Sequence, residues 1–289
     1  MTVEMTGDTT GDTTGDTTVD MTGAPTELAD GKILLHRDGA IGRITFNNPE
    51  RMNAMSLAMW DGLHAALDLL RDDDAIRVVV LEGAGDKAFV SGADITEFDT
   101  MRATPEGVAA YNARSEASDA ALYTFPKPTI AQIKGFCIGG GMGLAVACDI
   151  RICADDTRIG IPAGKLGLGY GYDGLRKLVD LAGPAVTAEV LYSTQLFTAS
   201  EALTMRLVNR VVPRADLNSQ VTALAQRIAA NAPLTLEAAK ATIRAIARPE
   251  AGVGRTEINA LTGACFASED YAEGRRAFAE KRAPQFRRR

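Results

Sequence analysis

The sequence predicts an α/β fold. Two stretches, 78–98 and 128–148, each run from an apolar, β-branched segment through a turn rich in small residues into a predicted helix. Two further short strands are indicated at 150–153 and 158–161. Alternation of strands and helices of this kind is typical of an α/β core.

Length and composition indicate one main globular domain. A chain of 289 residues can bury a large core, and its hydrophobic share of 46 % and charged share of 24 % are ordinary. A net charge of −6 gives no reason to expect a nucleic-acid partner, and no apolar run is long enough to cross a membrane. The cysteines lack metal-ligand spacing, so we expect no metal site and reduced residues, mostly in the core. They are Cys137, Cys148, Cys153 and Cys265.

The chain divides into three parts by composition. Residues 1–27 carry Gly-Asp-Thr-Thr three times and are predicted to be a disordered polar tail, although calcium binding by the Asp repeats is an alternative. The tail has no secretory signal pattern and no transit-peptide arginines, so we expect a cytoplasmic protein. Residues 28–212 form the predicted α/β core. Residues 213–289 show apolar stripes at helical spacing and form a predicted helical region.

The first part of the core is predicted from turn and helix signals. Asp38-Gly39 between two apolar runs indicates a β-hairpin, and Ser56 is a suitable N-cap for a helix over 56–71. An alanine-rich helix is expected over 105–123. Neither His36 nor His64 adjoins the glycine turns, so a Ser-His-Asp hydrolase has little support.

The two glycine turns carry the functional signal. The Gly-Gly-Gly run at 139–141 lies between a strand and a helix, where free backbone N–H groups can stabilise negative charge. Alone, such a run is more often a flexible turn. The similar turn at 91–94 follows another strand, and two such turns can direct two N–H groups at one point, as in an oxyanion hole.

These motifs resemble a known family. Segments 87–94 (Lys-Ala-Phe-Val-Ser-Gly-Ala-Asp) and 135–142 (Gly-Phe-Cys-Ile-Gly-Gly-Gly-Met) are similar to the two oxyanion-hole motifs of the enoyl-CoA hydratase/isomerase (crotonase) superfamily. Segments 43–56, 197–203, 207–212 and 268–286 also match, so the resemblance covers about 33–286. It implies a crotonase-like spiral of ββα units with a C-terminal helical trimerisation region. It also implies a homotrimer or homohexamer without nucleic-acid or membrane partners.

The resemblance implies an acyl-CoA substrate, with coenzyme A as part of the substrate and not a separate cofactor. By the family motif, the N–H groups of Ala93 and Gly140 stabilise the thioester enolate. The chemistry would then be that of a lyase or isomerase, as in fatty acid metabolism.

Further residues are expected to contact coenzyme A. Lys87 matches a family position near the adenine, and Lys281 matches one near the 3′-phosphate of a neighbouring subunit's ligand. A solvated helix end is the alternative for Lys281. Ser91, Ala93 and Phe278 are expected to add contacts. Thr96 stands where many relatives have another lysine, which indicates a weaker grip on the ligand.

The proton-transfer groups depart from the family pattern. Hydratases of this family carry two glutamates, and the matching positions here are Gly143 and Ala163. Neither side chain can move a proton, a function that normally contributes about 10²–10⁴-fold to the rate. No glutamate occurs anywhere in 139–171.

Tyr170, Tyr172 and Asp173 are the candidate replacements. Tyrosines can donate hydrogen bonds, and Asp173 can act as a base or simply cap a helix that begins near Gly174. Lys165 is a further candidate acid, or an ordinary exposed lysine. In decarboxylase-like relatives, a tyrosine near this position holds the substrate carboxylate.

Three hypotheses follow for this site. The first is a family enzyme with an unusual acid–base set, and the second is a decarboxylase of a malonyl-type CoA ester. The third is a non-catalytic acyl-CoA-binding subunit.

Overall fold

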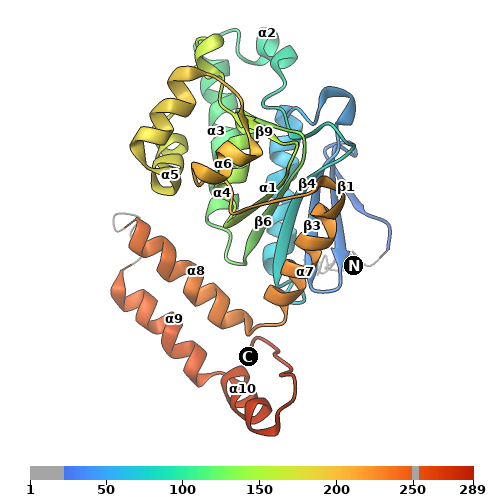
Figure 1. The fold of residues 1–289 in the computed structure, drawn as a ribbon, viewed down its shortest axis with the longest axis vertical. Helices are drawn as coiled ribbons and strands as arrows, with labels where there is room; N and C mark the ends of the chain where they lie inside the picture. Colours follow the sequence, from blue (N-terminus) through green and yellow to red (C-terminus); the bar gives the residue numbers. More distant parts are fainter. Residues whose placement is uncertain (1–22, 249–253) are drawn as a thin grey trace, which may run out of the picture.

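The computed structural model describes residues 23–248 and 254–289. It confirms the predicted α/β class: two β-sheets lie among helices, and further helices follow at the C-terminal end (Figure 1). The first strand begins at Thr26. The predicted disordered tail therefore lies almost entirely outside the described residues.

The larger sheet has seven strands in the order β1-β2-β3-β4-β6-β8-β11, and the smaller has four in the order β10-β9-β7-β5. Pairing is parallel from β3 to β11 and from β5 to β9, and antiparallel elsewhere. The strands are β1 Thr26–Leu28, β2 Ile33–Asp38, β3 Ile41–Phe46, β4 Val78–Gly83, β5 Ala88–Val90, β6 Thr129–Ile133, β7 Phe136–Ile138, β8 Ile150–Ala154, β9 Arg158–Gly160, β10 Phe197–Thr198 and β11 Arg210–Val212.

The chain winds as a spiral of ββα units, as the resemblance implied. In three successive turns, a strand of the large sheet is followed by a strand of the small sheet and then by helix: β4, β5 and α2–α3; β6, β7 and α4; β8, β9 and α5. The α-helices are α1 Leu57–Asp72, α2 Phe98–Met101, α3 Pro105–Tyr123, α4 Gly140–Ala147, α5 Tyr172–Ser193, α6 Ala199–Thr204, α7 Leu217–Ala229, α8 Pro233–Ala247, α9 Arg255–Ala267 and α10 Glu269–Glu280. Short 3₁₀ turns occur at Pro49–Arg51, Ile95–Glu97, Ala163–Lys165 and Arg214–Asp216.

Local signals predicted the early elements correctly. Ser56 caps α1, and its hydroxyl accepts a hydrogen bond from Met59 N at 3.3 Å. The hairpin turns at Gly39, whose φ of 60° suits a residue without a side chain. His64 pairs with Asp68 on the outer face of α1, so it takes no part in the glycine turns.

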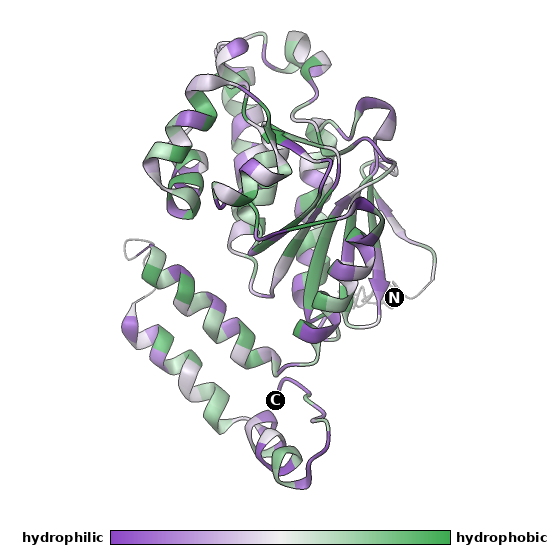
Figure 2. Cartoon of the chain, in the orientation of Figure 1, coloured by the Kyte–Doolittle hydropathy of each residue, from purple (hydrophilic) through white to green (hydrophobic). Residues whose placement is uncertain are grey.

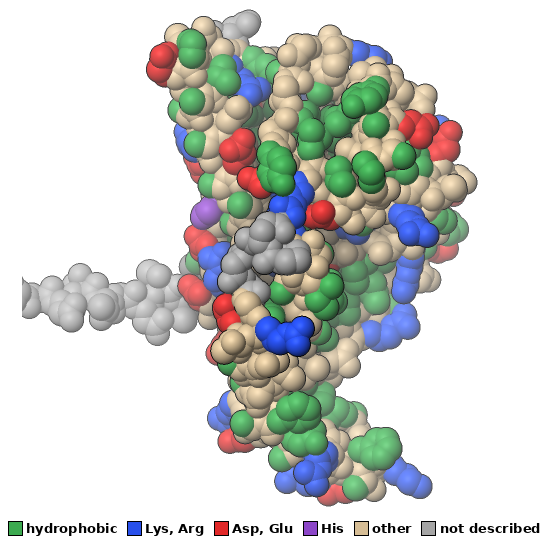
Figure 3. Space-filling model, turned by 90° about the vertical axis from the view of Figure 1, so that its left-hand side faces the viewer, with side chains coloured by type: hydrophobic (Ala, Val, Ile, Leu, Met, Phe, Trp, Pro, Cys, Tyr) green, Lys and Arg blue, Asp and Glu red, His purple; other side chains and the backbone are tan. Residues whose placement is uncertain are grey.

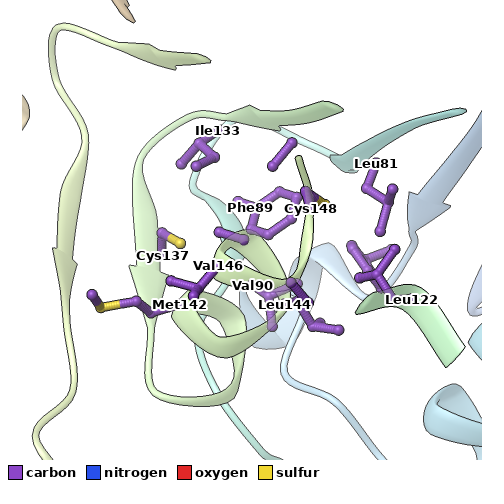
Figure 4. Packing of buried hydrophobic residues seen from close by; sticks show 14 of the residues in the cluster. Leu81, Phe89, Val90, Leu122, Ile133, Cys137, Met142, Leu144, Val146 and Cys148 are labelled. Atoms are coloured by element: carbon purple, nitrogen blue, oxygen red, sulfur yellow. The ribbon is translucent and has the colours of Figure 1, made fainter. Parts of the chain in front are cut away.

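The central strands are buried on both faces, which explains their continuous apolar sequences. Val78 and Val80 of β4 face α7, while Val79 and Leu81 belong to the main core with α1 and α4. The central strands are largely green, that is hydrophobic, in Figure 2. Cys137, Cys148 and Cys153 are free and buried in the core, and Figure 4 shows Cys137 and Cys148 packed around α4. Cys265 on α9 is free and only half-buried. The core prediction thus holds for three of the four.

Helices α8, α9 and α10 form a C-terminal arm that extends from the α/β core (Figure 1). α9 buries no residue, and apolar side chains are exposed towards the end of the arm (Figure 3). Phe266 of α9 and Phe278 of α10 are 63 % and 87 % exposed there, and Ile246, near the C-terminal end of α8, is 74 % exposed. Across the described part of the chain, no helix is both long and apolar enough to cross a membrane.

Candidate active site

The two glycine turns lie side by side because their strands, β5 and β7, are parallel neighbours. After each strand, the turn contains a glycine with positive φ: 117° at Gly92 after β5 and 55° at Gly139 after β7. The segments that precede β5 and β7 also lie close together, and this requires a glycine at position 135. A Cβ atom on Gly135 would lie 2.0 Å from Lys87 O. The turns therefore meet at one edge of the small sheet.

The structure brings the backbone amides of Ala93 and Gly140 together. A Cβ atom built on Gly140 would lie 3.8 Å from Ala93 N. Neither N–H has an acceptor among the residues that the structure describes. Ala93 is held from both sides, since Met55 N donates to Gly92 O and Asp94 N donates to Met55 O, each at 2.8 Å. Two unpaired amides fixed in this way form a site that can bind an oxyanion.

Trp60 borders this site, a contact that the sequence did not predict. Trp60 on α1 lies with its ring 3.5 Å from the Cβ position of Gly140. Its indole N–H is buried and has no hydrogen-bond partner within the described residues. The Tyr111 hydroxyl of α3 donates to Met55 O at 3.5 Å. Burial raises the pKa of Tyr111. The helical periodicity of 56–71 marked Trp60 as a core residue but could not show which neighbour it meets.

Tyr170 lies on the other side of the turn. Its hydroxyl is 3.9 Å from the Cβ position of Gly139, and it makes no hydrogen bond within the described residues. Burial raises the pKa of Tyr170 to about 12, because the phenolate loses its solvation. The side chain is thus a neutral phenol, available to donate a hydrogen bond beside the two amides.

Tyr172 and Asp173 lie on the exposed start of α5. Tyr172 is 73 % exposed, and its hydroxyl accepts a hydrogen bond from Arg176 at 3.3 Å. The capping interpretation of Asp173 is wrong: α5 begins at Tyr172, its N-cap is Gly171, and no side chain caps it. Asp173 instead sits in the first turn, where a negative charge interacts favourably with the helix dipole. Lys165 is exposed as well.

Gly143 and Ala163, the positions that the sequence resemblance matches to the family's glutamates, differ in the space around them. A Cβ atom on Gly143 would meet no atom within 4 Å, and this residue is half-buried. Ala163 is 8 % exposed and begins a 3₁₀ turn. One turn into α4, the site therefore has open space that a larger side chain or a substrate group can occupy.

The predicted coenzyme A contacts are spread over two regions. Lys87 is exposed at the entry to β5, and the Ser91 hydroxyl donates to Arg51 O at 3.3 Å. Arg51 also donates to Thr96 Oγ1 at 2.6 Å, so a cation lies where Thr96 replaces the family's lysine. Phe278 and Lys281 lie at the end of the arm, far from α4 (Figure 1).

No group of three or more His, Cys, Asp or Glu side chains in the described ranges is arranged to hold a metal ion.

Comparison with known proteins identifies the family. The enoyl-CoA hydratase/isomerase family model matches residues 36–289. The chain belongs to this family. It is 32 % identical over 250 residues to a short-chain-enoyl-CoA hydratase of Clostridium acetobutylicum, covering 86 % of this chain and 95 % of that protein. It is 33 % identical over 257 residues to a carnitinyl-CoA dehydratase of Salmonella typhi, covering 86 % and 96 %.

The fold agrees with this assignment. A crystal structure described as an enoyl-CoA hydratase/carnithine racemase from Magnetospirillum magneticum superposes with a TM-score of 0.86 at 42 % identity. The match covers 89 % of this chain and 96 % of that one. The protein is thus an enzyme of the enoyl-CoA hydratase/isomerase family that acts on acyl-CoA thioesters and has the crotonase fold.

Proposed function

We propose that this enzyme stabilises the enolate of an acyl-CoA thioester between the N–H groups of Ala93 and Gly140, with the Tyr170 hydroxyl as the nearby proton donor. The observation that supports it most is the convergence of two unpaired amides and one unpaired, neutral phenol at the same turn. Charge that develops on the thioester oxygen would be stabilised without reorganisation of the site. Tyr170 would transfer the proton to or from the α-carbon, since the side chains at Gly143 and Ala163 include no acid or base.

The leading reaction under this proposal is addition of water across the double bond of an enoyl-CoA, or its reverse, as the names of the relatives indicate for those proteins. In the direction of addition, Tyr170 would give its proton to the α-carbon as the water oxygen bonds to the β-carbon, and the Tyr170 phenolate would then take the proton that the water loses. Tyr172 and Asp173, on the exposed start of α5, would have to turn inwards to assist.

Decarboxylation of a malonyl-type CoA ester is the second candidate. Loss of CO₂ forms the same enolate without a general base, which suits a site with glycine and alanine at positions 143 and 163. The open space at Gly143 can receive the extra carboxylate. In this reaction, Tyr170 would hold the carboxylate and then protonate the enolate.

Incubation with crotonyl-CoA and with methylmalonyl-CoA, followed by mass spectrometry, separates these reactions. A gain of water on the first supports hydration, and loss of CO₂ from the second supports decarboxylation. A Gly143→Glu variant sharpens the test, because its side chain has room and supplies the missing carboxylate. We expect it to raise hydration of crotonyl-CoA. The proposal would be contradicted if the wild type converted neither ester and bound neither of them.

We also propose that the protein assembles as a homotrimer or homohexamer through its arm. The exposed apolar side chains of α8 and α9, such as Ile246 and Phe266, support this proposal. In such an assembly, Phe278 and Lys281 of one subunit could reach the coenzyme A of another. Light scattering coupled to gel filtration tests it: a mass near 30.6 kDa, that of one chain, would contradict it.

A further inference from the structure

The far end of the oxyanion helix carries a charged residue that the proposed chemistry does not use. α4 is Gly140–Ala147, Cys148 is its C-cap, and Asp149 follows. An eight-residue helix is about 12 Å long. Asp149 is therefore separated from the Gly140 amide only by one short, buried helix.

The Asp149 carboxylate joins three parts of the protein. Oδ2 accepts hydrogen bonds from Thr129 N at 2.8 Å and Thr129 Oγ1 at 3.0 Å, at the start of β6. The same oxygen pairs with Lys240 Nζ of α8 at 2.5 Å. Oδ1 lies 3.4 Å from Arg244 Nη2, one turn further along α8. Lys240 is only 7 % exposed and also donates to Lys127 O at 2.6 Å.

Other contacts leave α4 little sideways freedom. A Cβ atom on Gly141 would lie 2.1 Å from Val90 O, so the helix backbone touches β5 directly. The buried Arg151 side chain donates to Ala145 O at 3.2 Å and to Cys148 O at 2.6 Å. The helix is thus confined against β5, the strand that leads to Ala93, and its C-terminal end is anchored through Asp149.

The arm docks on the core through a row of cations. Lys240, Arg244 and Arg248 follow one another at four-residue spacing, so they share one face of α8. Lys240 and Arg244 meet Asp149, and Arg248 Nε lies 3.0 Å from Asp180 of α5. One of these docking points is the end of the helix that carries the proposed oxyanion amide.

We infer that Asp149 is a positioning residue for the oxyanion hole. Its ion pair with the buried Lys240 couples the docking of the C-terminal arm to the alignment of the Gly140 N–H. This inference rests on the proposed role of Ala93 and Gly140. Removing the Asp149 charge leaves the buried Lys240 ammonium without its counter-ion, so the end of α4 must shift or take up water. A shift of about 1 Å at a catalytic group can lower a rate by about 100-fold.

The hydrogen bonding of the hole can be measured without turnover. The absorption band of 4-dimethylaminocinnamoyl-CoA moves to longer wavelength when its thioester carbonyl is polarised. Titration of the purified protein with this ester gives both the affinity and the size of the red shift. A wild type that binds the ester with no red shift would reject the oxyanion hole itself, which is a different result from a failure of the present inference.

Asp149→Asn is the decisive variant, because it keeps the side chain's size and removes its charge. We expect an affinity within about threefold of wild type, at most half of the red shift, and a kcat about 10–100-fold lower with little change in KM. The control is Arg288→Gln. Arg288 pairs with Asp74 of the core and Glu237 of α8, so its loss disturbs the docked arm away from α4. It should keep the full red shift.

A second variant guards against misfolding. Arg244→Gln removes the outer counter-ion and leaves the pair between Asp149 and Lys240 intact. We expect a smaller decrease in the red shift, in the same direction as for Asp149→Asn. If every folded variant at these two positions gives the wild-type red shift, Asp149 does not position the oxyanion hole. An equal decrease in Arg288→Gln would overturn the inference as well.

Discussion

The two turns that supply the proposed oxyanion donors are held in different ways. Gly140 begins a helix that is enclosed by the core, and the next residue, Gly141, touches the β5 backbone. Ala93 precedes Asp94, whose carboxylate accepts from Arg51 Nη1 at 2.9 Å and from Thr96 N at 3.1 Å. The Arg51 side chain is 53 % exposed. The Gly140 donor is therefore held by packing. The Ala93 donor is held by backbone hydrogen bonds to Met55 and by the polar contacts of Asp94 with Arg51 and Thr96.

This difference predicts which substitutions each of the two turns tolerates. Core packing is dense and relaxes little, so a methyl group added where α4 touches the β5 backbone has a large effect. A surface ion pair contributes only about 0–1 kcal/mol and weakens in salt. We expect substitutions near Gly140 to have effects that depend on the side-chain volume they add. Substitutions near Ala93 should have effects that depend on the charge they remove.

Gly141→Ala should have the largest effect on stability. The added Cβ would lie 2.1 Å from Val90 O, so α4 and β5 must separate. We expect a loss of about 3 kcal/mol in the free energy of unfolding, measured by urea denaturation. Gly143→Ala is the matched control on the same helix, because its Cβ meets no atom within 4 Å. It should be neutral, or stabilising by up to about 1 kcal/mol. Equal effects of the two substitutions would contradict the packing account.

Tyr170→Phe should have the largest effect on catalysis among changes that leave the fold intact. The hydroxyl lies beside the glycine turn, so its loss removes the only acid we place there. We expect kcat to fall about 100-fold and acyl-CoA affinity to stay unchanged. Tyr172→Phe is the control, since that hydroxyl lies on an exposed helix start. Steady-state kinetics on the ester that is turned over, with calorimetric binding, measures both. Indistinguishable kinetics for the two variants would remove Tyr170 from the mechanism.

Asp94→Asn should have the smallest effect, and one that depends on pH. Desolvation acts to raise the pKa of Asp94, but hydrogen bonds from Thr96 and the Arg51 charge outweigh it, so the pKa is lowered from 3.8. The carboxylate's contribution to stability is therefore complete above that pH and is lost as the pH falls through the lowered value. At neutral pH we expect up to about 1 kcal/mol of destabilisation and at most about a fivefold lower kcat.

Thermal unfolding of wild type and Asp94→Asn, followed from pH 7 into acid, checks this prediction. The difference between the two proteins should disappear in strong acid, because both then carry a neutral side chain. A difference that persists unchanged below about pH 2 would show that Asp94 acts through packing and not through charge.

Local patterns predicted the elements that local physics determines. The N-cap at Ser56, the alanine-rich α3 and the two glycine turns all depend on neighbouring residues, and each was placed correctly. The start of α5 was predicted two residues too late, because several glycines and tyrosines at 167–174 favour no single N-cap. That error produced the wrong role for Asp173.

Contacts between distant segments could not be predicted in this way. Nothing in the local sequence of α8 indicates that Lys240 is buried against Asp149, or that Trp60 borders Gly140. The family resemblance provided the spiral and the identity of the proposed amide donors. It did not provide the open space at Gly143, which depends on side chains from other elements.

The central claim is that Ala93 and Gly140 share one thioester oxygen. A crystal structure with acetoacetyl-CoA, an ester that readily carries enolate charge, tests it most directly. We predict that the thioester oxygen lies about 2.7–3.1 Å from both backbone nitrogens, with the Tyr170 hydroxyl facing the α-carbon. A thioester oxygen bound away from these two amides would contradict the proposed chemistry.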